Sequence, residues 1–307
     1  MPERPHGPQV PPIAANVAQR PHRVFDVERD AGVATVWLDR PDARNALGGA
    51  FFEELPRVMG EVSDDPAVRA VVVCARGRDF SVGLDLEEMS GIFTGEPVGT
   101  ATTPDDLAPG PAPLAASAAA RAAATRRSVL GLQAAVNAVA ACPKPVIAAV
   151  HGYCIGGGMD LVTACDIRLA SVDAVFSVRE TRMAIVADLG TLQRLPRIVG
   201  AGHVAELALT GKDVDARRAR DIGLVNDVYP DRDALFEAAA AMGREIAALS
   251  PLAVQGTKSV LAANDGRTVA QGLDYVATWN AGMLASKDLA EAFSAFVEKR
   301  PPRFTGT

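Results

Sequence analysis

The chain of 307 residues has few of the residues that mark several large functional classes. Aromatic residues make up 5% of it, and 31 Lys and Arg against 37 Asp and Glu give a formal net charge of −6. So few aromatic rings leave little for base stacking, and an acidic chain opposes nucleic-acid binding. The one basic run, residues 217–220, is typical of a solvated helix face. We therefore expect no nucleic-acid partner.

Cysteine and histidine are scarce as well, with four residues of each. Cys74, Cys142, Cys154 and Cys165 stand in apolar stretches without CxxC spacing, and the histidines are scattered. This predicts buried, reduced thiols and no zinc or other metal site. No apolar run reaches the length of a membrane span, and no secretory or peroxisomal signal is visible. We expect a cytoplasmic protein without a membrane partner.

Hydrophobic residues make up 49% of the chain, enough for a sizeable core. Residues 1–23 contain six of the 21 prolines and predict a disordered or draped tail. Residues 24–230 alternate apolar runs with helical patterns, which predicts an α/β core with a buried parallel sheet. The expected strands include residues 33–38, 68–74, 146–150, 167–170 and 174–177, and the expected helices include 51–62 and 115–141, after a loop at 91–114.

Residues 231–307 differ, because their patterns are helical throughout. The four expected helices span residues 233–249, 250–264, 268–286 and 287–298. Ser250 followed by Pro251 is a typical helix start, with the serine as cap and the proline at the first helical position. We therefore expect an α/β core followed by a C-terminal helical region.

Two segments place glycines where a predicted strand turns, residues 80–86 and residues 151–160. Consecutive glycines opening a helix let backbone N–H groups approach a ligand at the positive end of the helix dipole. Tight packing of a strand on a helix would require the same glycines. A dinucleotide site or a P-loop is excluded, because neither GxGxxG after the first strand nor Gly-Lys-Ser/Thr occurs. Ser81 lacks the GxSxG context of a nucleophile.

Three acids stand in or beside apolar sequence: Asp160, Glu180 and Asp188. Buried carboxylates are costly, so each needs a partner or a task. Structural roles are available to all three. Asp160 could favour a helix N-terminus, Glu180 could pair with the arginines beside it, and Asp188 could cap a helix starting near residue 189.

Longer segments resemble the crotonase, or enoyl-CoA hydratase/isomerase, superfamily. They are residues 38–47 (LDRPDARNAL), 80–86 (FSVGLDL) and 143–152 (PKPVIAAVHG) with the glycines that follow. The resemblance extends over about residues 25–299. Within the superfamily, residues 151–195 are most similar to the Δ3,5-Δ2,4-dienoyl-CoA isomerases, which have a third acid at the position of Asp188.

The resemblance implies a crotonase-like spiral of ββα repeats, with the C-terminal helices as a trimerisation region. It implies a homotrimer or a dimer of trimers, and an acyl-CoA thioester as substrate, without a separate cofactor. The backbone N–H groups of Leu84 and Gly157 would form an oxyanion hole. The residues expected to contact the substrate are Val82, Gly83, Leu84, Asp85, Leu86, Gly156 and Gly157. Arg44 is a weaker candidate for such a contact.

The implied reaction moves two double bonds from positions 3 and 5 to positions 2 and 4, an auxiliary step of fatty-acid β-oxidation. Glu180 and Asp160 would transfer protons at two separated carbons, while Asp188 would hold Glu180 and tune its proton affinity. One alternative is an enoyl-CoA hydratase, in which Asp160 and Glu180 activate water and Asp188 has no task. A second alternative is a non-catalytic scaffold that binds acyl-CoA.

Overall fold

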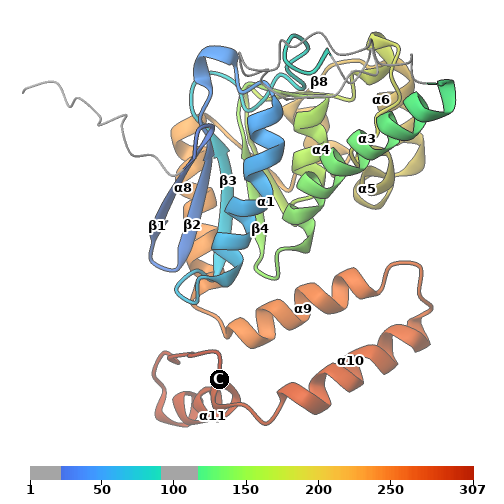
Figure 1. Cartoon of the computed structure of the whole chain (residues 1–307). Coiled ribbons are helices and arrows are strands. Elements are labelled where there is room, and N and C mark those ends of the chain that lie inside the picture. Colours follow the sequence, from blue (N-terminus) through green and yellow to red (C-terminus); the bar gives the residue numbers. More distant parts are fainter. Residues whose placement is uncertain (1–21, 91–116) are drawn as a thin grey trace, which may run out of the picture.

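A computed structural model describes residues 22–90 and 117–307 of the chain (Figure 1). The strands of its main sheet are β1 (Phe25–Asp30), β2 (Val33–Leu38), β3 (Ala70–Ala75), β4 (Val146–Val150), β6 (Ile167–Ser171) and β9 (Asp227–Tyr229). They lie in the order β1-β2-β3-β4-β6-β9, and every pair is parallel except β1 with β2. A smaller sheet contains β5 (Tyr153–Ile155), β7 (Val175–Ser177) and β8 (Val214–Asp215).

Helices occupy most of the remaining described chain. Before the C-terminal region they are α1 (Gly49–Asp64), α3 (Ala118–Ala141), α4 (Gly157–Thr163), α5 (Thr191–Ile198), α6 (Ala201–Thr210) and α7 (Ala216–Asp221), with short 3-10 turns η2 (Pro41–Ala43) and η4 (Glu180–Met183). The C-terminal helices are α8 (Arg232–Ala247), α9 (Pro251–Ala263), α10 (Val269–Met283) and α11 (Lys287–Glu298).

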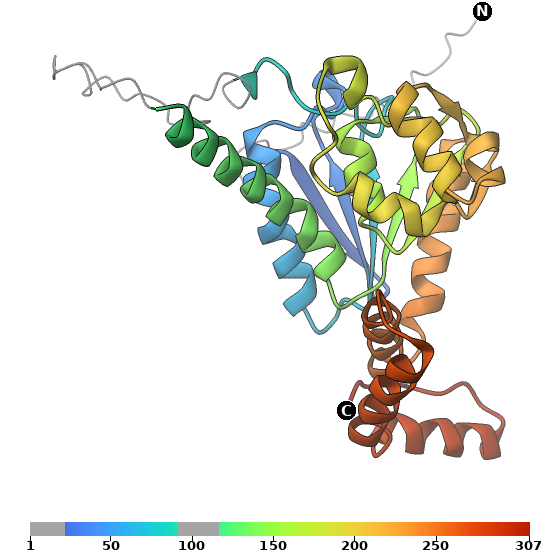
Figure 2. The same cartoon turned by 90° about the vertical axis from the view of Figure 1, so that its right-hand side faces the viewer.

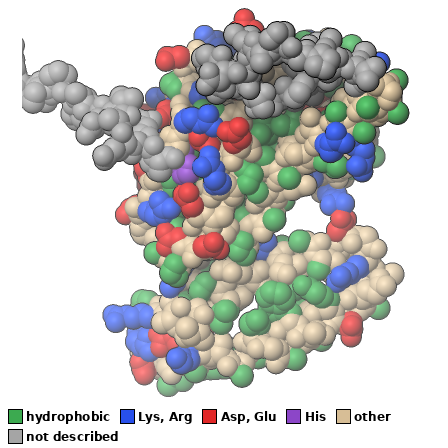
Figure 3. Space-filling model, in the orientation of Figure 1, with side chains coloured by type: hydrophobic (Ala, Val, Ile, Leu, Met, Phe, Trp, Pro, Cys, Tyr) green, Lys and Arg blue, Asp and Glu red, His purple; other side chains and the backbone are tan. Residues whose placement is uncertain are grey.

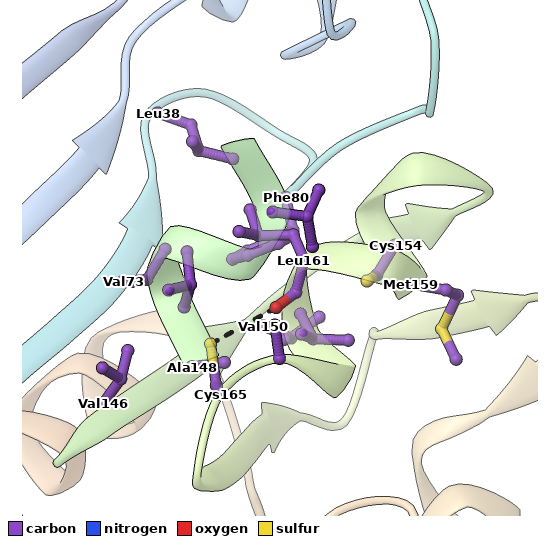
Figure 4. Close-up of a cluster of buried hydrophobic side chains, with 14 of the residues drawn as sticks. Leu38, Val73, Phe80, Val146, Ala148, Val150, Cys154, Met159, Leu161 and Cys165 are labelled. Carbon is purple, nitrogen blue, oxygen red and sulfur yellow. Dashed lines mark hydrogen bonds between the residues drawn. The ribbon is translucent and has the colours of Figure 1, made fainter. Parts of the chain in front are cut away.

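Both faces of the main sheet are covered, which explains its continuous apolar strands. Side chains alternate between the faces along a strand. In β3, Val71 and Val73 join the larger core with α1, α3 and α4, whereas Val72 and Cys74 pack with Leu235 of α8. Figure 4 shows part of the larger core. All four cysteines are free and buried, as predicted.

Helix α4 connects this core to the smaller sheet, and all seven of its residues are buried. Met159 and Leu161 extend from it into the apolar cluster of Figure 4. In the same cluster the Cys165 thiol donates a hydrogen bond to the carbonyl oxygen of Leu161 at 3.5 Å. Packing of α4 against the larger core therefore holds the residues of its first turn in place.

The expected strands at residues 33–38 and 146–150 and the four expected C-terminal helices are confirmed, with helix ends within a few residues. Ser250 caps α9 as predicted, accepting a bond from the N–H of Ala253. Strands β1, β8 and β9 and helices α6 and α7 were not predicted, because they are short or exposed on one side. The expected tail (residues 1–23) lies almost wholly outside the described residues, and the expected loop (residues 91–114) lies outside them altogether.

The last three helices extend away from the sheets, whereas α8 packs on the main sheet (Figures 1 and 2). Large apolar side chains on them are exposed, including Leu261 of α9 (69%), Leu273 of α10 (62%) and Phe296 of α11 (84%). Hydrophobic side chains gather over α9 and α10 in Figure 3. Within the described residues no single helix is long and apolar enough to cross a membrane; only α8 and α9 together pass that test, with a bend of 107° between them.

Candidate active site

Two turns of the backbone meet beside the start of α4. Residues around Ser81 run parallel to β5: the Ser81 N–H donates to the Tyr153 carbonyl at 2.8 Å, and the Ile155 N–H donates to the Ser81 carbonyl at 3.1 Å. Gly83 has a φ of +90°, and a Cβ there would lie 3.1 Å from the Ile155 carbonyl oxygen. Glycine at this position therefore permits the close approach of the two turns.

Leu84 and Gly157, whose N–H groups are the predicted donors, lie close together beside these turns, since a Cβ on Gly157 would lie 4.0 Å from Cδ2 of Leu84. The Leu47 N–H donates to the Gly83 carbonyl at 2.8 Å, and the Asp85 N–H donates to the Leu47 carbonyl at 3.0 Å. Gly83 and Asp85 thus make both bonds to Leu47, and Leu84 between them makes neither. Gly157 is the first residue of α4, and its N–H has no acceptor inside the helix. The two residues predicted to form an oxyanion hole are thus neighbours in the structure.

Asp160 lies in the first turn of α4 and is 1% exposed. Its Oδ1 accepts two hydrogen bonds from Thr191, one from the backbone N–H and one from Oγ1, each at 2.7 Å. Burial, together with the charges of Glu180 and Asp188, raises the pKa of Asp160 to about 7 against the effect of these bonds. The helix terminus that Asp160 contacts is therefore that of α5, not that of its own helix.

Glu180 begins η4, and its carboxyl group faces the glycine turn. Its Oε1 lies 3.7 Å from the position of a Cβ on Gly156. Its Oε2 is buried and has no hydrogen-bond partner within the described residues. Burial raises the pKa of Glu180, and the negative charge of Asp188 raises it further. A buried, unpaired carboxylate oxygen is costly in a merely structural role.

The ion pairs that the sequence allowed for Glu180 are not formed within the described residues. Arg179 pairs with Asp213 instead. The Nε of Arg182 donates to the carbonyl oxygen of Thr210 at 3.4 Å. Both arginines thus turn toward the segment after α6, which leaves the Glu180 carboxyl group without a cation.

Asp188 lies in the exposed loop before α5, where Gln133 of α3 donates to its backbone carbonyl at 2.6 Å. The cap residue of α5 is Gly190, so Asp188 is not the cap of this helix. The capping role considered for Asp188 is therefore wrong. Its negative charge raises the pKa of both Asp160 and Glu180, so the three carboxyl groups form one electrostatic cluster.

The other residues predicted to contact the substrate differ in how exposed they are and in how many partners they already have. Leu86 is 49% exposed, and Val82 is half-buried. Asp85 already has two partners: it pairs with Arg40 at 3.2 Å and accepts a bond from the Glu88 N–H at 3.2 Å. Asp85 therefore stabilises the turn, and Leu86 is the more available of the two for contact with a ligand.

Arg44, the weaker candidate, also has structural partners. Its Nε donates to Asp79 at 2.7 Å, and its guanidinium lies 5.3 Å from the centre of the Tyr153 ring. Its backbone is left-handed, with a φ of 51°. Arg44 thus has structural partners in Asp79 and Tyr153, while 41% of its side chain stays exposed.

Thr191 was not among the predicted residues. It is fully buried at the first position of α5, 31 residues from the carboxylate that it binds. A threonine after a glycine at a helix start is common, so the sequence contained no signal for this contact. Only the packing of α4 beside α5 brings the two side chains together.

Known proteins are similar to this chain in sequence and in fold over most of the chain's length. A family described as "Enoyl-CoA hydratase/isomerase" matches residues 28–101 and 114–307. The "Delta(3,5)-Delta(2,4)-dienoyl-CoA isomerase, peroxisomal" of Arabidopsis thaliana is 44% identical over 277 residues, which are 90% of this chain and 93% of the plant protein. The mitochondrial protein of the same description from Rattus norvegicus is 41% identical, over 87% of this chain and 77% of its own.

Among solved structures, an enoyl-CoA hydratase from Bacillus anthracis superposes with a TM-score of 0.79 and 29% sequence identity. The match covers 93% of this chain and all of the bacterial hydratase. The predicted spiral α/β fold with C-terminal helices is therefore confirmed.

Proposed function

Because the chain belongs to the enoyl-CoA hydratase/isomerase family, we propose that it converts 3,5-dienoyl-CoA into 2,4-dienoyl-CoA. The observation that carries this proposal is the third acid, since Asp188 raises the pKa of both Asp160 and Glu180. Adding water to one double bond needs two acids, and a third negative charge beside them has no task. The named isomerases, at 41% and 44% identity, support the same choice.

The reaction requires one proton to leave and another to arrive four carbons away. Loss of a proton from C2 sends its electron pair into the thioester, which forms an enolate conjugated with both carbon–carbon double bonds. Protonation at C6 then restores the thioester carbonyl and leaves double bonds at C2 and C4. The enolate oxygen needs donors that are already in place, and the N–H groups of Leu84 and Gly157 supply them. Loss of one such donor typically costs roughly 10²–10³ in rate.

The placement of the two carboxyl groups supports a separate role for each. Glu180 faces Gly156, next to the Gly157 donor, so a thioester bound in that gap presents its C2 to Glu180. Asp160 is buried deeper and lies one helical turn further along α4, where it would meet C6. Two separated acids suit the reaction, because one carboxyl group could not reach both carbons.

The required protonation states follow from these assignments. Glu180 must be ionised to accept the C2 proton, and Asp160 must be neutral to donate a proton to C6. The pKa of Asp160 of about 7 keeps a large neutral fraction near neutral pH. The negative charge of Asp188 makes Glu180 a stronger base by raising its pKa. Each acid then returns to its starting state by exchange with solvent.

The substrate assay separates the three hypotheses. We expect the purified protein to convert 3,5-octadienoyl-CoA into a product with the absorbance of a conjugated 2,4-dienoyl thioester. A 2-enoyl-CoA is assayed in parallel for hydration. Faster hydration than isomerisation would favour the hydratase, and binding of both thioesters without turnover would favour the scaffold. The Glu180→Gln variant controls for contaminating activity, because it lacks the proposed base.

The exposed apolar residues of α9–α11 support a homotrimer or a dimer of trimers as the active form. A large apolar surface on separate helices is unusual in a stable monomer. Phe293 and Val297, for instance, are 67% and 78% exposed on neighbouring turns of α11. Contact with further copies of the chain would bury this surface.

A further inference from the structure

We propose that Thr191 is a positioning residue for Asp160, which fixes Oδ1 with two hydrogen bonds and leaves Oδ2 as the oxygen that transfers the proton. The inference deepens the proposed isomerase function and rests on it. It starts from an asymmetry in one carboxyl group. Both hydrogen bonds from Thr191 go to Oδ1, each at 2.7 Å, and neither goes to Oδ2.

The asymmetry decides where the acid carries its proton. An oxygen that already accepts an N–H and an O–H would crowd a third hydrogen against these two. The proton of neutral Asp160 therefore sits on Oδ2. A carboxyl group free to rotate about its Cβ–Cγ bond would exchange the positions of its two oxygens, and the protonated oxygen would no longer be held in one direction. Two donors from one residue prevent such rotation, because both must be broken together.

Thr191 can do this because its own position is fixed. It is the first residue of α5, so its backbone N–H has no acceptor within the helix and is free to bind Asp160. A β-branched side chain is restricted at χ1, which directs the hydroxyl group. The helix is anchored by the buried Leu195 and by Arg194, which bonds to the carbonyl of Leu189 at 3.3 Å and to Asn137 of α3.

The hydrogen bonds also set how readily Asp160 gives up its proton. The charges of Glu180 and Asp188 oppose the negative charge of Asp160, whereas Arg194 favours it. The buried thiol of Cys154 also interacts with Asp160. Against this background the two donors of Thr191 favour the ionised form, and so they lower the pKa that burial alone would give. Without the hydroxyl group, Asp160 would hold its proton to higher pH.

The chain contains a matched control. Thr163 is also buried and also bonds to Asp160, but its hydroxyl donates to the backbone carbonyl at 3.1 Å and not to the carboxyl group. Thr163→Val removes a buried hydroxyl from the same neighbourhood without touching the proton-transferring group. Thr191→Ser keeps the hydroxyl that Thr191→Val removes.

The test measures pH profiles of kcat and kcat/KM for isomerisation, with melting temperatures. We expect Thr191→Val to lower kcat roughly 10-fold or more and to move the alkaline limb of the profile up by about one pH unit. Thr191→Ser should restore most of both, and Thr163→Val should leave the profile in place. An unshifted profile in a folded Thr191→Val protein overturns the proposal. Equal rate losses in the two valine variants, in proportion to lowered melting temperatures, also overturn it.

A second measurement does not depend on turnover. Infrared difference spectra recorded across pH report the protonated carboxyl band, and Asp160→Asn identifies the contribution of Asp160. Thr191→Val should move its titration to higher pH, whereas an unchanged titration overturns the proposal. If the wild-type protein does not isomerise 3,5-octadienoyl-CoA but this titration shifts as expected, the proposed function fails and the contact of Thr191 with Asp160 remains established.

Discussion

Gly83 faces the backbone nitrogen of Gly157, and a Cβ on Gly83 would lie 3.7 Å from that nitrogen. The two glycines are 74 residues apart in the chain, and their approach brings together Leu84 and Gly157, the two residues of the proposed oxyanion hole. Since backbone donors need no side chain, their positions depend on how closely the two turns can pack. Any side chain added at this point therefore alters the gap itself.

Gly157→Val should abolish most turnover and leave the fold intact. A Cβ at position 157 would lie 2.8 Å from Cδ1 of Leu47. The Leu47 side chain must therefore rotate, and it would then crowd the gap. We expect activity to fall by roughly 10²–10³, the typical cost of an oxyanion donor. Gly202→Val in α6 is the control, because a Cβ there meets nothing within 4 Å. Wild-type activity in a folded Gly157→Val protein would show that the donor lies elsewhere.

Asp188→Asn should slow isomerisation without destabilising the protein. Removal of the negative charge lowers the pKa of Glu180 and weakens it as a base, so we expect a loss of roughly 10²-fold in kcat. The acid limb of the pH profile should move to lower pH, because Glu180 ionises more easily. Since Asp188 caps no helix, the melting temperature should stay within about 2 °C of the wild type. A normal rate with a lowered melting temperature would contradict the catalytic role.

Asp160→Asn should stabilise the protein at alkaline pH while it abolishes turnover. The pKa of Asp160 is about 7 when folded against 3.8 for the free side chain, so wild-type stability falls as pH rises between these values. Asparagine carries no charge and removes this loss. We expect a gain on the order of 4 kcal/mol in the free energy of unfolding above pH 7 and no gain below pH 4. Urea unfolding at pH 4 and pH 8, at one protein concentration, measures the difference.

Asp288→Asn provides a control of opposite sign. Burial opposes the charge of Asp288, but hydrogen bonds from Ser250, Thr305 and Gly306 outweigh it and lower the pKa. Stability from such a group is present above the unfolded pKa and is lost as pH falls through the folded pKa. This variant should therefore be less stable than the wild type at pH 8. A gain in both variants would mean that net charge, and not the site, controls the pH dependence.

The oligomeric state is tested on α11. Sedimentation at micromolar concentration should give a trimer or a hexamer, and Phe296→Asp should dissociate it, because an 84% exposed phenylalanine would become a charged residue in the contact. Val172→Asp is the control, at a residue that is 57% exposed and lies away from α9–α11. A wild-type monomer would refute the assembly, and unchanged assembly of Phe296→Asp would exclude α11 from it.

The sequence by itself determined the secondary structure where a local signal existed. Helix α11 spans Lys287–Glu298 as predicted, because Ser286 caps it and its apolar spacing is helical. Strand β4 was recognisable from its unbroken apolar run and the prolines before it. The three acids were also found from the sequence, since a carboxylate in an apolar stretch is conspicuous wherever it folds.

Only the tertiary structure decided which partner each acid has. Asp160 bonds to Thr191, Asp188 caps nothing, and the arginine before Glu180 pairs with Asp213. Each result depends on elements that are distant in the chain, and a side chain has many polar groups within reach before packing selects one. Local propensity extends over a few residues, whereas hydrogen bonds between α4 and α5 depend on the relative placement of both helices. The residue types of the three acids are therefore local information, and their geometry is not.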